Sequence, residues 1–523
     1  YYYSHDQSLC RSLSFSYRFL SEKGLVRKLI AKLHHQNSYL DASSWTDFYR
    51  PNFDLVNSEM TLVYEGKHTK YRGQATKDNL FKLELDSKKF QLGALGQHIL
   101  NLSTMAMQRV NDTRNVDVEA PLASDPLTGY TVRMGKVFKY GEPMGVFAQT
   151  YSFLNPITRF NWGVSLMDDI AFNEKLTMKL GARYDFFSTK DDRKGGAQNM
   201  GYIDYLLRNM QGAAMNFDPI NDKESGFSFL GVVSYAHSQL LNASYRFSTG
   251  FRVPNTEEKY FQFYSAWPSF IVLSNRDLKA EKSYNHELEF NGRGKGFGYL
   301  LSLYYNQYSD FIELKQGTLA VKEPLMQAPK SISYVKNVNQ TSAHLKGFDA
   351  ALQLYPGEWI DLLKGFMVSS AFSYAEGSSS SGMSMLGIQP LTGNIGVEYT
   401  DPKARWQVNI KANLYFAKPV SQTTFWDKDA AGKELIRRYP ASFMSNAYTF
   451  DAYGYYKVTR NFTVRLGIYN ILNSEYLRWD DLRQLTNPAL LSNINYFFQD
   501  GKKSLSRFSR PKRYISLALE YKI

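Results

Sequence analysis

Hydrophobic and polar residues alternate one by one along several stretches of the chain, most clearly at its end. In the closing segment RYISLALEYKI, one set of alternate positions is apolar and the other is mixed. The apolar set is Ile515, Leu517, Leu519, Tyr521 and Ile523. A period of two residues is typical of a β-strand whose faces meet different surroundings. The pattern predicts a strand with lipid on one side and a polar lumen on the other.

The same alternation recurs upstream of this segment. It is clear in three runs, which are Leu13, Phe15, Tyr17 and Phe19; Leu176, Met178 and Leu180; and Phe462, Val464, Leu466 and Ile468. The run from Phe450 to Tyr456 alternates less cleanly. In the first 120 residues, Leu25–Leu33 and Gln91–Val110 fit a helix as well as a strand. Strands therefore account for most of the chain, with two ambiguous segments.

The connections between these runs are of two lengths. Short turns such as Asp401–Lys403 and Thr459–Asn461 alternate with long polar stretches at roughly 188–224, 250–281, 309–345, 417–445 and 480–510. Short turns at one end and long loops at the other are typical of an outer-membrane barrel, whereas a soluble sandwich has shorter, evenly spaced strands. We predict an all-β fold, a large transmembrane antiparallel barrel of about 22 strands over residues 1–523. In this barrel Ile523 lies on the periplasmic side and the long loops lie outside the cell.

Composition supports a barrel. Aromatic residues make up 15% of the chain, with 38 Tyr and 35 Phe, yet the mean hydropathy is −0.40. There is no run of 18 or more apolar residues, so a helical membrane protein is excluded. Aromatic girdles and alternating faces explain why a chain can be rich in Tyr and Phe and still be hydrophilic on average.

Charge and cysteine content narrow the chemistry. The net charge is +13, but the basic residues are spread along the chain and no recognition helix emerges, so we expect no nucleic-acid partner. Solvated loops, lipopolysaccharide or an acidic protein ligand remain as explanations. One cysteine, Cys10, excludes a disulfide framework and a multi-cysteine metal site. The opening YYYSHDQSLC is not a signal peptide, so we interpret the sequence as a mature fragment or part of a longer chain.

Motifs for catalysis or phosphate binding are missing. No G-x-S-x-G, H-E-x-x-H or Cys–His signature is present, and we expect no enzyme. The glycine-rich stretch Gly292–Gly298 lacks the Lys-Ser/Thr ending of a phosphate loop and is interpreted as a tight turn between strands. The serine run Ser378–Ser381 is interpreted as a loop tip.

Five segments in order resemble the TonB-dependent outer-membrane receptor family. They are Gly181–Asp185 (GARYD), Ser248–Pro254 (STGFRVP), Asn275–Asn285 (NRDLKAEKSYN), Lys346–Asp349 (KGFD) and Tyr469–Asn473 (YNILN) with Tyr476. The positions that match the family pattern include Phe251, Arg252, Pro254, Asn275, Leu278 and Glu281. The resemblance implies a barrel filled by an N-terminal plug and coupled through that plug to the TonB complex.

Two further segments are similar to haemoglobin and haemoglobin–haptoglobin receptors within that family. Glu257–Phe263 (EEKYFQF) resembles their E-x-Y-F-x-F, and Tyr476–Arg483 (YLRWDDLR) resembles their Y-x-x-W-D-S-x-R. Transferrin receptors share a related version of the second segment. The resemblance implies import of haem iron, with haem as the transported ligand, no tightly bound cofactor, and haemoglobin or a haem-carrier protein as partner.

The chain departs from the family at three points. The plug and the TonB box are not found, so we expect a plug of on the order of 150 residues ahead of Tyr1 in a complete chain. The last residue is Ile523, where such barrels commonly end in an aromatic. Many haem receptors carry a His between the motifs that correspond here to Ser248–Pro254 and Asn275–Asn285. In this chain the segment between them, Asn255–Ser274, contains no His.

The candidate ligand-binding residues are therefore aromatic and basic. They are Tyr260, Phe261, Phe263, Tyr264, Trp267, Phe270, Trp479 and Arg483, in the loops around 250–281 and 480–510. Aromatic and arginine side chains anchor protein interfaces, although the same aromatics also suit simple packing of the loop.

Candidate haem ligands are fewer. Haem iron accepts His or Tyr among its axial ligands, which leaves His344, Tyr260 and Tyr264 as candidates, and no other metal site is predicted. A solvated loop histidine is the simpler interpretation of His344. Because the 255–274 segment lacks His, we expect that this segment does not capture the iron itself. Haem release would then depend on binding energy that distorts the carrier globin, or on a surface lipoprotein or secreted haem carrier that delivers the protein.

Three function classes remain from the sequence. The first is an outer-membrane receptor of a Gram-negative bacterium that takes haem from haemoglobin or a haem carrier by TonB-dependent transport. The second is a TonB-dependent receptor for transferrin or another iron source. The third is a passive porin or adhesin barrel.

Overall fold

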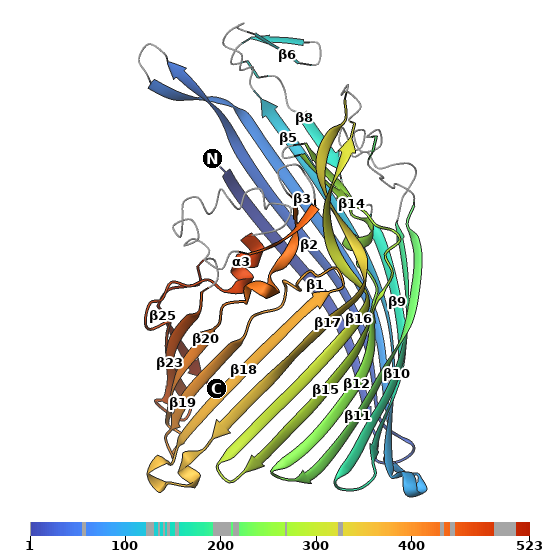
Figure 1. The fold of residues 1–523 in the computed structure, drawn as a ribbon, viewed down its shortest axis with the longest axis vertical. Helices are drawn as coiled ribbons and strands as arrows, with labels where there is room; N and C mark the ends of the chain where they lie inside the picture. Colours follow the sequence, from blue (N-terminus) through green and yellow to red (C-terminus); the bar gives the residue numbers. More distant parts are fainter. Residues whose placement is uncertain are drawn as a thin grey trace.

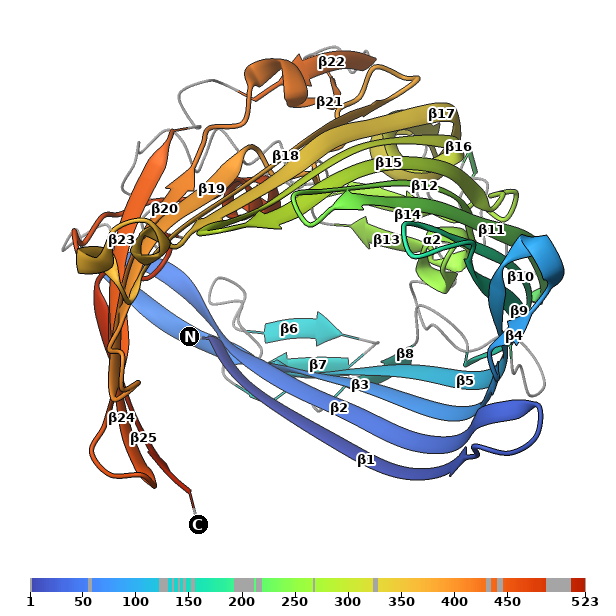
Figure 2. The same cartoon turned by 90° about the horizontal axis from the view of Figure 1, so that it is seen from below.

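The computed structural model describes residues 2–54, 59–121, 130–133, 136–139, 142–143, 147–151, 156–191, 211–212, 219–266, 269–322, 328–428, 434–439, 445–485 and 509–522. Most of them belong to one antiparallel sheet that curls into a wall around a lumen (Figures 1 and 2). No helix of the described residues is long and apolar enough to cross a membrane.

The main sheet has 21 strands. Four short ones, β4 (Phe90–Gln91), β8 (Phe147–Tyr151), β13 (Phe263–Ala266) and β14 (Ser269–Leu273), pair beside longer strands, which leaves 17 in the continuous wall. In order of pairing these are β1 (Tyr2–Leu20), β2 (Val26–Asp54), β3 (Glu59–Ser87), β5 (Gln97–Pro121), β9 (Ile157–Ala171), β10 (Leu176–Asp191), β11 (Asn221–Ser238), β12 (Leu241–Arg252), β15 (Glu281–Gly294), β16 (Phe297–Val321), β17 (Lys330–Leu354), β18 (Phe366–Ser379), β19 (Thr392–Thr400), β20 (Trp406–Tyr415), β23 (Ala447–Lys457), β24 (Phe462–Tyr469) and β25 (Tyr514–Tyr521).

The other elements are short. Two hairpins stand apart from the main sheet, β6 (Tyr130–Arg133) with β7 (Lys136–Lys139) and β21 (Thr424–Lys428) with β22 (Glu434–Arg438). The helices are α2 (Thr256–Tyr260), α3 (Trp479–Leu485) and the 3-10 turns η1 (Gly93–Leu95), η2 (Pro356–Glu358), η3 (Asp361–Leu363) and η4 (Val420–Gln422). The all-β antiparallel fold predicted from the alternation is confirmed.

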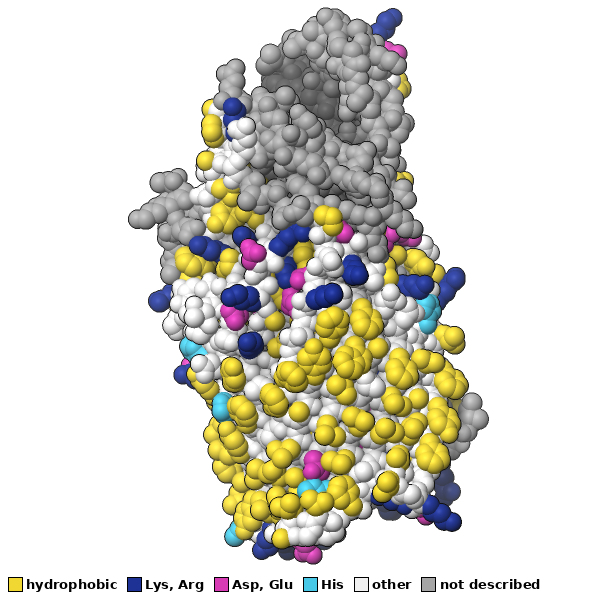
Figure 3. All heavy atoms as spheres, turned by 90° about the vertical axis from the view of Figure 1, so that its right-hand side faces the viewer, with side chains coloured by type: hydrophobic (Ala, Val, Ile, Leu, Met, Phe, Trp, Pro, Cys, Tyr) yellow, Lys and Arg dark blue, Asp and Glu magenta, His cyan; other side chains and the backbone are white. Residues whose placement is uncertain are grey.

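Along the described wall strands, apolar residues gather on the outer face and polar residues on the inner face, as the alternation predicts. Register places Leu466 opposite Leu517 and Val464 opposite Leu519, and all of these side chains point outward on β24 and β25. Leu519 is 65% exposed, which is unusual for a leucine in a folded protein unless a partner or lipid covers it. Hydrophobic side chains gather in a broad band on the outer surface, with charged groups above it (Figure 3).

The inner face carries ion pairs instead. The Arg109 Nε atom lies 2.7 Å from Asp78 Oδ1, between neighbouring strands β5 and β3. Arg183 and Asp185, two residues apart on β10, pair at 2.5 Å. A Cβ at Gly163 on β9 would lie 2.3 Å from the Asp185 carboxylate, so the glycine there leaves room for this pair. The GARYD segment therefore contributes an ion pair to the lumen wall.

Short turns join the strands at one end and long connections join them at the other (Figure 1). The predicted turns Asp401–Lys403 and Thr459–Asn461 lie between β19 and β20 and between β23 and β24. Tyr521 pairs with Phe462, so β25 ends at the short-turn end, as predicted for a periplasmic C-terminus. The stretch Gly292–Gly298 contains the tight turn between β15 and β16, formed by Lys295 and Gly296, with Gly296 at φ +82°.

Two segments that the sequence left ambiguous are resolved, and two expectations need correction. Leu25–Leu33 falls mostly in β2, and Gln91–Val110 is mostly β5 after the single 3-10 turn, so neither segment is a long helix. The stretch 309–345 is not a polar loop along its length, because β16 and β17 extend through it on both sides of the connection. Ser378 and Ser379 belong to β18, and only Ser380 and Ser381 lie in the turn.

The wall has two free edges among the described strands, β1 and β25, with a gap between them (Figure 2). Neighbours in the wall are antiparallel, so the first and the seventeenth strands run in the same direction. An antiparallel closure between these edges needs an odd number of further strands, whatever supplies them.

Candidate binding site at the long-loop end

The segment between β12 and β15 folds over the inner side of the wall at the long-loop end (Figure 2). It begins with the five-residue helix α2. The Asn255 side chain accepts a hydrogen bond from the Glu258 backbone N–H (2.7 Å), and the Glu258 carboxylate accepts one from the Asn255 N–H (2.9 Å). This reciprocal capping satisfies the N–H groups that a helix start leaves without partners. The local sequence therefore fixes where the segment turns.

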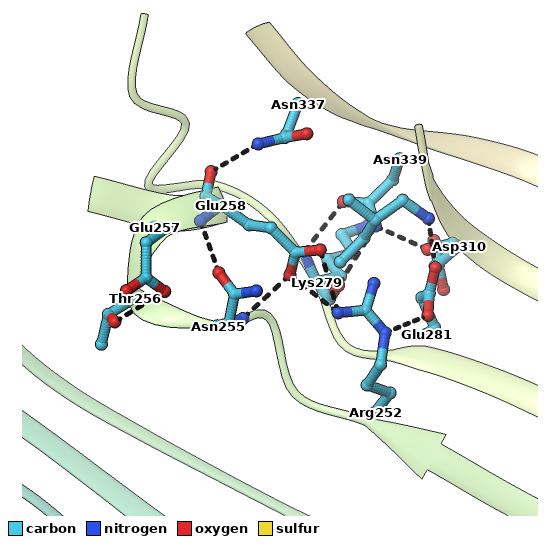
Figure 4. A network of polar contacts seen from close by, with 11 residues as sticks. Arg252, Asn255, Thr256, Glu257, Glu258, Lys279, Glu281, Asp310, Asn337 and Asn339 are labelled. Carbon is cyan, nitrogen blue, oxygen red and sulfur yellow. Dashed lines mark hydrogen bonds and ion pairs between the residues drawn. The ribbon is translucent and has the colours of Figure 1, made fainter. Parts of the chain in front are cut away.

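Arg252 anchors this helix to the wall (Figure 4). Its Nε atom donates to Glu281 on β15 at 2.5 Å, and its Nη1 atom donates to Glu258 at 2.7 Å. The other Glu281 oxygen accepts the backbone N–H of Ile312 at 2.6 Å. One guanidinium thus joins the end of β12, α2 and the start of β15, in the forked geometry that suits arginine.

The other family-motif positions hold the same segment in place. The Asn275 side chain donates to the Asn337 carbonyl (2.8 Å), and the Asn337 side chain donates to the Glu258 carbonyl (3.2 Å). Leu278 is buried. The motif residues Arg252, Asn275, Leu278 and Glu281 therefore build the scaffold of the loop.

Lys259 and Tyr260, at the end of α2, contact the wall rather than the solvent. The Lys259 ammonium forms ion pairs with Asp222 and with Glu224 (2.7 Å to the latter) on β11. The Tyr260 hydroxyl donates to Asp222 at 2.6 Å, and its ring packs with Ile157 and Ile220. Burial, together with the hydrogen bond to Asp222, raises the pKa of Tyr260 well above its ordinary value. The phenol is therefore neutral, and Tyr260 serves as a donor and a packing group.

The remaining residues of this loop lie further along the segment. Phe261 and Phe270 are half-buried. Phe263 and Tyr264 belong to β13, which pairs with β14, and β14 runs parallel to β17 from Phe270 opposite Ser333 to Leu273 opposite Lys336. Trp267 lies outside the described residues. The described strands β13 and β14 are held against β17 by the pairing of β14 with β17.

His344 lies apart from this loop. It is within β17, opposite Gln307, and not just before a strand as the sequence suggested. Register puts it on the same face as Lys346, Tyr305 and Leu303, which is the outer face of the wall. The structure therefore does not bring His344 together with Tyr260.

Trp479 and Arg483 belong to α3 at the same end. Trp479 is 4% exposed and packs with Phe425, Tyr439 and Leu482, and its indole N–H donates to the Leu386 carbonyl at 2.7 Å. Arg483 pairs with Asp480 at 2.7 Å. Trp479 is thus a packing residue, and much of the predicted 480–510 loop lies outside the described residues.

The packing around Trp479 involves residues that the sequence did not single out. Lys418, which follows β20, places its ammonium over the Trp479 ring, and Arg478 places its guanidinium over the Tyr415 ring. Arg478 lies inside a noticed motif, but nothing in the sequence around Lys418 marks it. Among the described residues no group of three or more His, Cys, Asp or Glu could hold a metal ion.

Comparison with known proteins defines the class. Residues 2–471 match the family described as TonB dependent receptor-like, beta-barrel, and the chain belongs to this family of transport receptors. The solved structure of the copper transporter OprC is similar in fold, with a TM-score of 0.59, 14% identity, and coverage of 98% of this chain and 65% of that chain.

Curated relatives point to a group within this family. The chain is 26% identical over 398 residues to "Hemoglobin-binding protein A" of Haemophilus influenzae, covering 71% of this chain and 38% of the relative. It is 28% identical over 379 residues to "Hemoglobin-haptoglobin utilization protein B" of Neisseria meningitidis, covering 67% of this chain and 42% of the relative. The chain spans less than half the length of these relatives.

Proposed function

We propose that this chain is the barrel part of an outer-membrane receptor that binds haemoglobin or a haem-carrier protein and imports haem iron by TonB-dependent transport. The observation that carries the proposal is the family match over residues 2–471 together with relatives named for haemoglobin binding. The apolar outer band and the charged inner wall support a place in the bacterial outer membrane.

The loop at the long-loop end supports binding of a protein. Haem in a globin is enclosed, so a receptor must first grip the carrier over an interface of about 1,200 Å² or more. The β13–β14 hairpin is paired with β17, and Arg252 anchors the α2 segment that precedes it; a rigid support lowers the entropic cost of such an interface. Energy coupling would pass through a plug that contacts the TonB complex, and a surface lipoprotein or secreted carrier would deliver haem.

Direct binding tests the proposal. Full-length receptor in detergent is immobilised, and haemoglobin, haemoglobin–haptoglobin and transferrin are passed over it in turn. Binding of haemoglobin or its haptoglobin complex, without binding of transferrin, is the expected result. Transferrin binding alone would overturn the choice of ligand, and would favour the alternative iron source within the same family.

A further inference from the structure

A small cavity lies on the inner side of the wall at the long-loop end, apart from the α2 segment. Its volume is about 250 Å³, and it lies among the β18–β19 connection, the residues after β20 and the start of α3. Its walls include Tyr415, Lys418, Arg478, Trp479 and Asp480. Tyr415 is on β20 opposite Thr392, and both line the cavity from the inner face of the sheet.

Two cations face this cavity. The Lys418 side chain is buried, with the residue only 3% exposed, and its ammonium donates one hydrogen bond, to the Ile388 carbonyl at 2.7 Å. Since an ammonium has three donors, two have no acceptor among the described residues. The Arg478 guanidinium lies 5.4 Å from the Tyr415 ring centre, and its Nε atom is buried without a hydrogen-bond partner in the described part of the chain.

Among the residues that the structure describes, neither cation has an anionic partner. Within the described ranges no carboxylate lies within ion-pair distance of Lys418 or Arg478, and Asp480, the acid in the cavity wall, pairs with Arg483. A buried charge without a counter-ion is costly, because it loses its hydration without compensation. Burial, helped by the nearby positive charge of Arg483 and opposed by Glu376, lowers the pKa of Lys418 to about 8. An incoming anion would relieve this cost.

The size of the cavity limits what can enter. Pockets that enclose a whole drug-sized ligand measure roughly 300–1,000 Å³, so this one holds only the end of a larger molecule. The aromatic walls, formed by Tyr415 and Trp479, suit a polar group attached to a short hydrocarbon chain. A carboxylate matches two cationic donors in charge, and arginine binds it through charge-assisted hydrogen bonds.

We propose that this cavity binds a carboxylate group of the transported or presented ligand, with Lys418 and Arg478 as its charged donors. The inference rests on the proposed function for the identity of that ligand. The carboxylate has two sources in such a ligand, a haem propionate and an acidic side chain of the carrier protein.

The first test uses a small carboxylate and does not depend on haem. Trifluoroacetate is added to the full-length receptor in detergent, and its line broadening is measured by fluorine NMR. The wild type and Lys418→Arg are expected to broaden the signal, and Lys418→Met and Arg478→Gln to lose that broadening. Lys411→Met, on the preceding strand β20 and outside the cavity, is the matched control and should behave as the wild type. Broadening that persists in both Lys418→Met and Arg478→Gln would overturn the proposal.

The pH dependence gives this test a second readout. Binding in the wild type should weaken as pH rises through about 8, because Lys418 then loses its proton. The anion stabilises the protonated form, so the loss should shift to higher pH as trifluoroacetate is raised. Lys418→Arg, which stays charged, should show no such loss. A wild-type profile that is flat through this range would contradict the role of Lys418.

The second test identifies the source. Affinities of wild type and Lys418→Met are measured for haemin, haemin dimethyl ester and haem-free globin. If Lys418→Met loses about tenfold or more in affinity for haemin but none for the ester, the bound carboxylate is a haem propionate. If it loses as much in affinity for globin, the bound carboxylate is an acidic side chain of the carrier. If the wild type binds haemin or globin and Lys418→Met binds both equally well, the proposal fails. If the wild type binds none of haemin, globin and haemoglobin but broadens trifluoroacetate, the proposed function fails and the carboxylate site stands.

Discussion

Tyr260 shows how the environment of a single residue decides between two roles. From the sequence it is a candidate for iron ligation, for an interface and for packing. In the structure its hydroxyl donates to Asp222, its ring is buried, and its raised pKa keeps the phenol neutral. Lys259 next to it is held by the same aspartate. Sequence cannot supply this, because Asp222 lies 38 positions away and meets Tyr260 only through the pairing of the wall strands.

The first prediction concerns the spectrum of bound haem. Tyr260→Phe should leave the Soret band of the haem–receptor mixture unchanged, because the neutral, donating phenol is not an iron ligand. The substitution should lower the free energy of unfolding by roughly 1.5–3 kcal/mol, since Asp222 loses a hydrogen bond. Absorbance spectroscopy and urea unfolding in detergent measure the two effects. A clear Soret shift in Tyr260→Phe would identify it as an axial ligand.

Arg252 is the second residue whose role follows from its contacts. Arg252→Gln removes the ion pairs to Glu281 and Glu258 and leaves both carboxylates without their main cation. We expect faster backbone hydrogen exchange over residues 255–260 and little change in the wall strands. Arg246→Gln, on the same strand and paired with Glu287 at 2.9 Å, is the control and should leave that loop as slow as in the wild type. Equal exchange in the two variants would show that Arg252 does not order the loop.

At the scale of elements, periodicity predicts strands well and their lengths poorly. The alternation in Leu13–Phe19 and at the end of the chain identifies β1 and β25 and their outer faces. It fails where polar and apolar residues are mixed on both faces, and so β16 and β17 continue through a stretch that resembles a loop. It is ambiguous over Gln91–Val110, where apolar residues also recur at helical spacing, and there the ladders with β3 and β9 decide for a strand.

The β13–β14 hairpin is the element on which ligand binding is predicted to depend. Replacing residues 263–269 by a Gly-Ser linker of equal length should reduce haemoglobin affinity by about tenfold or more, because it removes the candidate aromatics Phe263, Tyr264 and Trp267 and keeps α2 and its ion pairs. The same replacement of 356–363, between β17 and β18 at the opposite end, is the control and should bind normally. Binding is measured on immobilised receptor. Unchanged affinity in the hairpin variant would place the ligand on another loop.

At the scale of the whole molecule, the wall and its open seam are the main features. Short turns and long loops predict the barrel and its orientation from the sequence alone. The seam could not be predicted, because alternation identifies strands but not which of them lie at an edge. In a bilayer, unpaired strand edges are too costly to remain exposed, so β1 and β25 need partners.

The geometry of the seam makes a countable prediction. Because β1 and β25 run in the same direction, an odd number of strands must close the barrel antiparallel. Electron microscopy of the full-length protein in nanodiscs would count them. An even number of strands between β1 and β25, or a direct parallel pairing of β1 with β25, would show that the barrel does not close with antiparallel neighbours throughout.

The net charge of +13 gives a further prediction at this scale. If basic loops steer an acidic face of the carrier, association should slow as ionic strength rises, since exposed charges are screened over about 8 Å at physiological salt. Dissociation should change less. Association rates measured from low to high salt test this, with haemin, which lacks the protein surface, as the comparison ligand. An association rate that does not depend on salt would show that charge does not steer the carrier to the receptor.

The most direct test of the central claim is receptor-dependent haem uptake. A Gram-negative strain that cannot make haem and lacks its own haem receptors would express the full-length protein, and growth on haemoglobin would be measured with and without a functional TonB complex. Growth that requires both the receptor and TonB is the predicted result. Growth that requires the receptor but is the same without TonB would contradict active transport and identify a passive barrel instead.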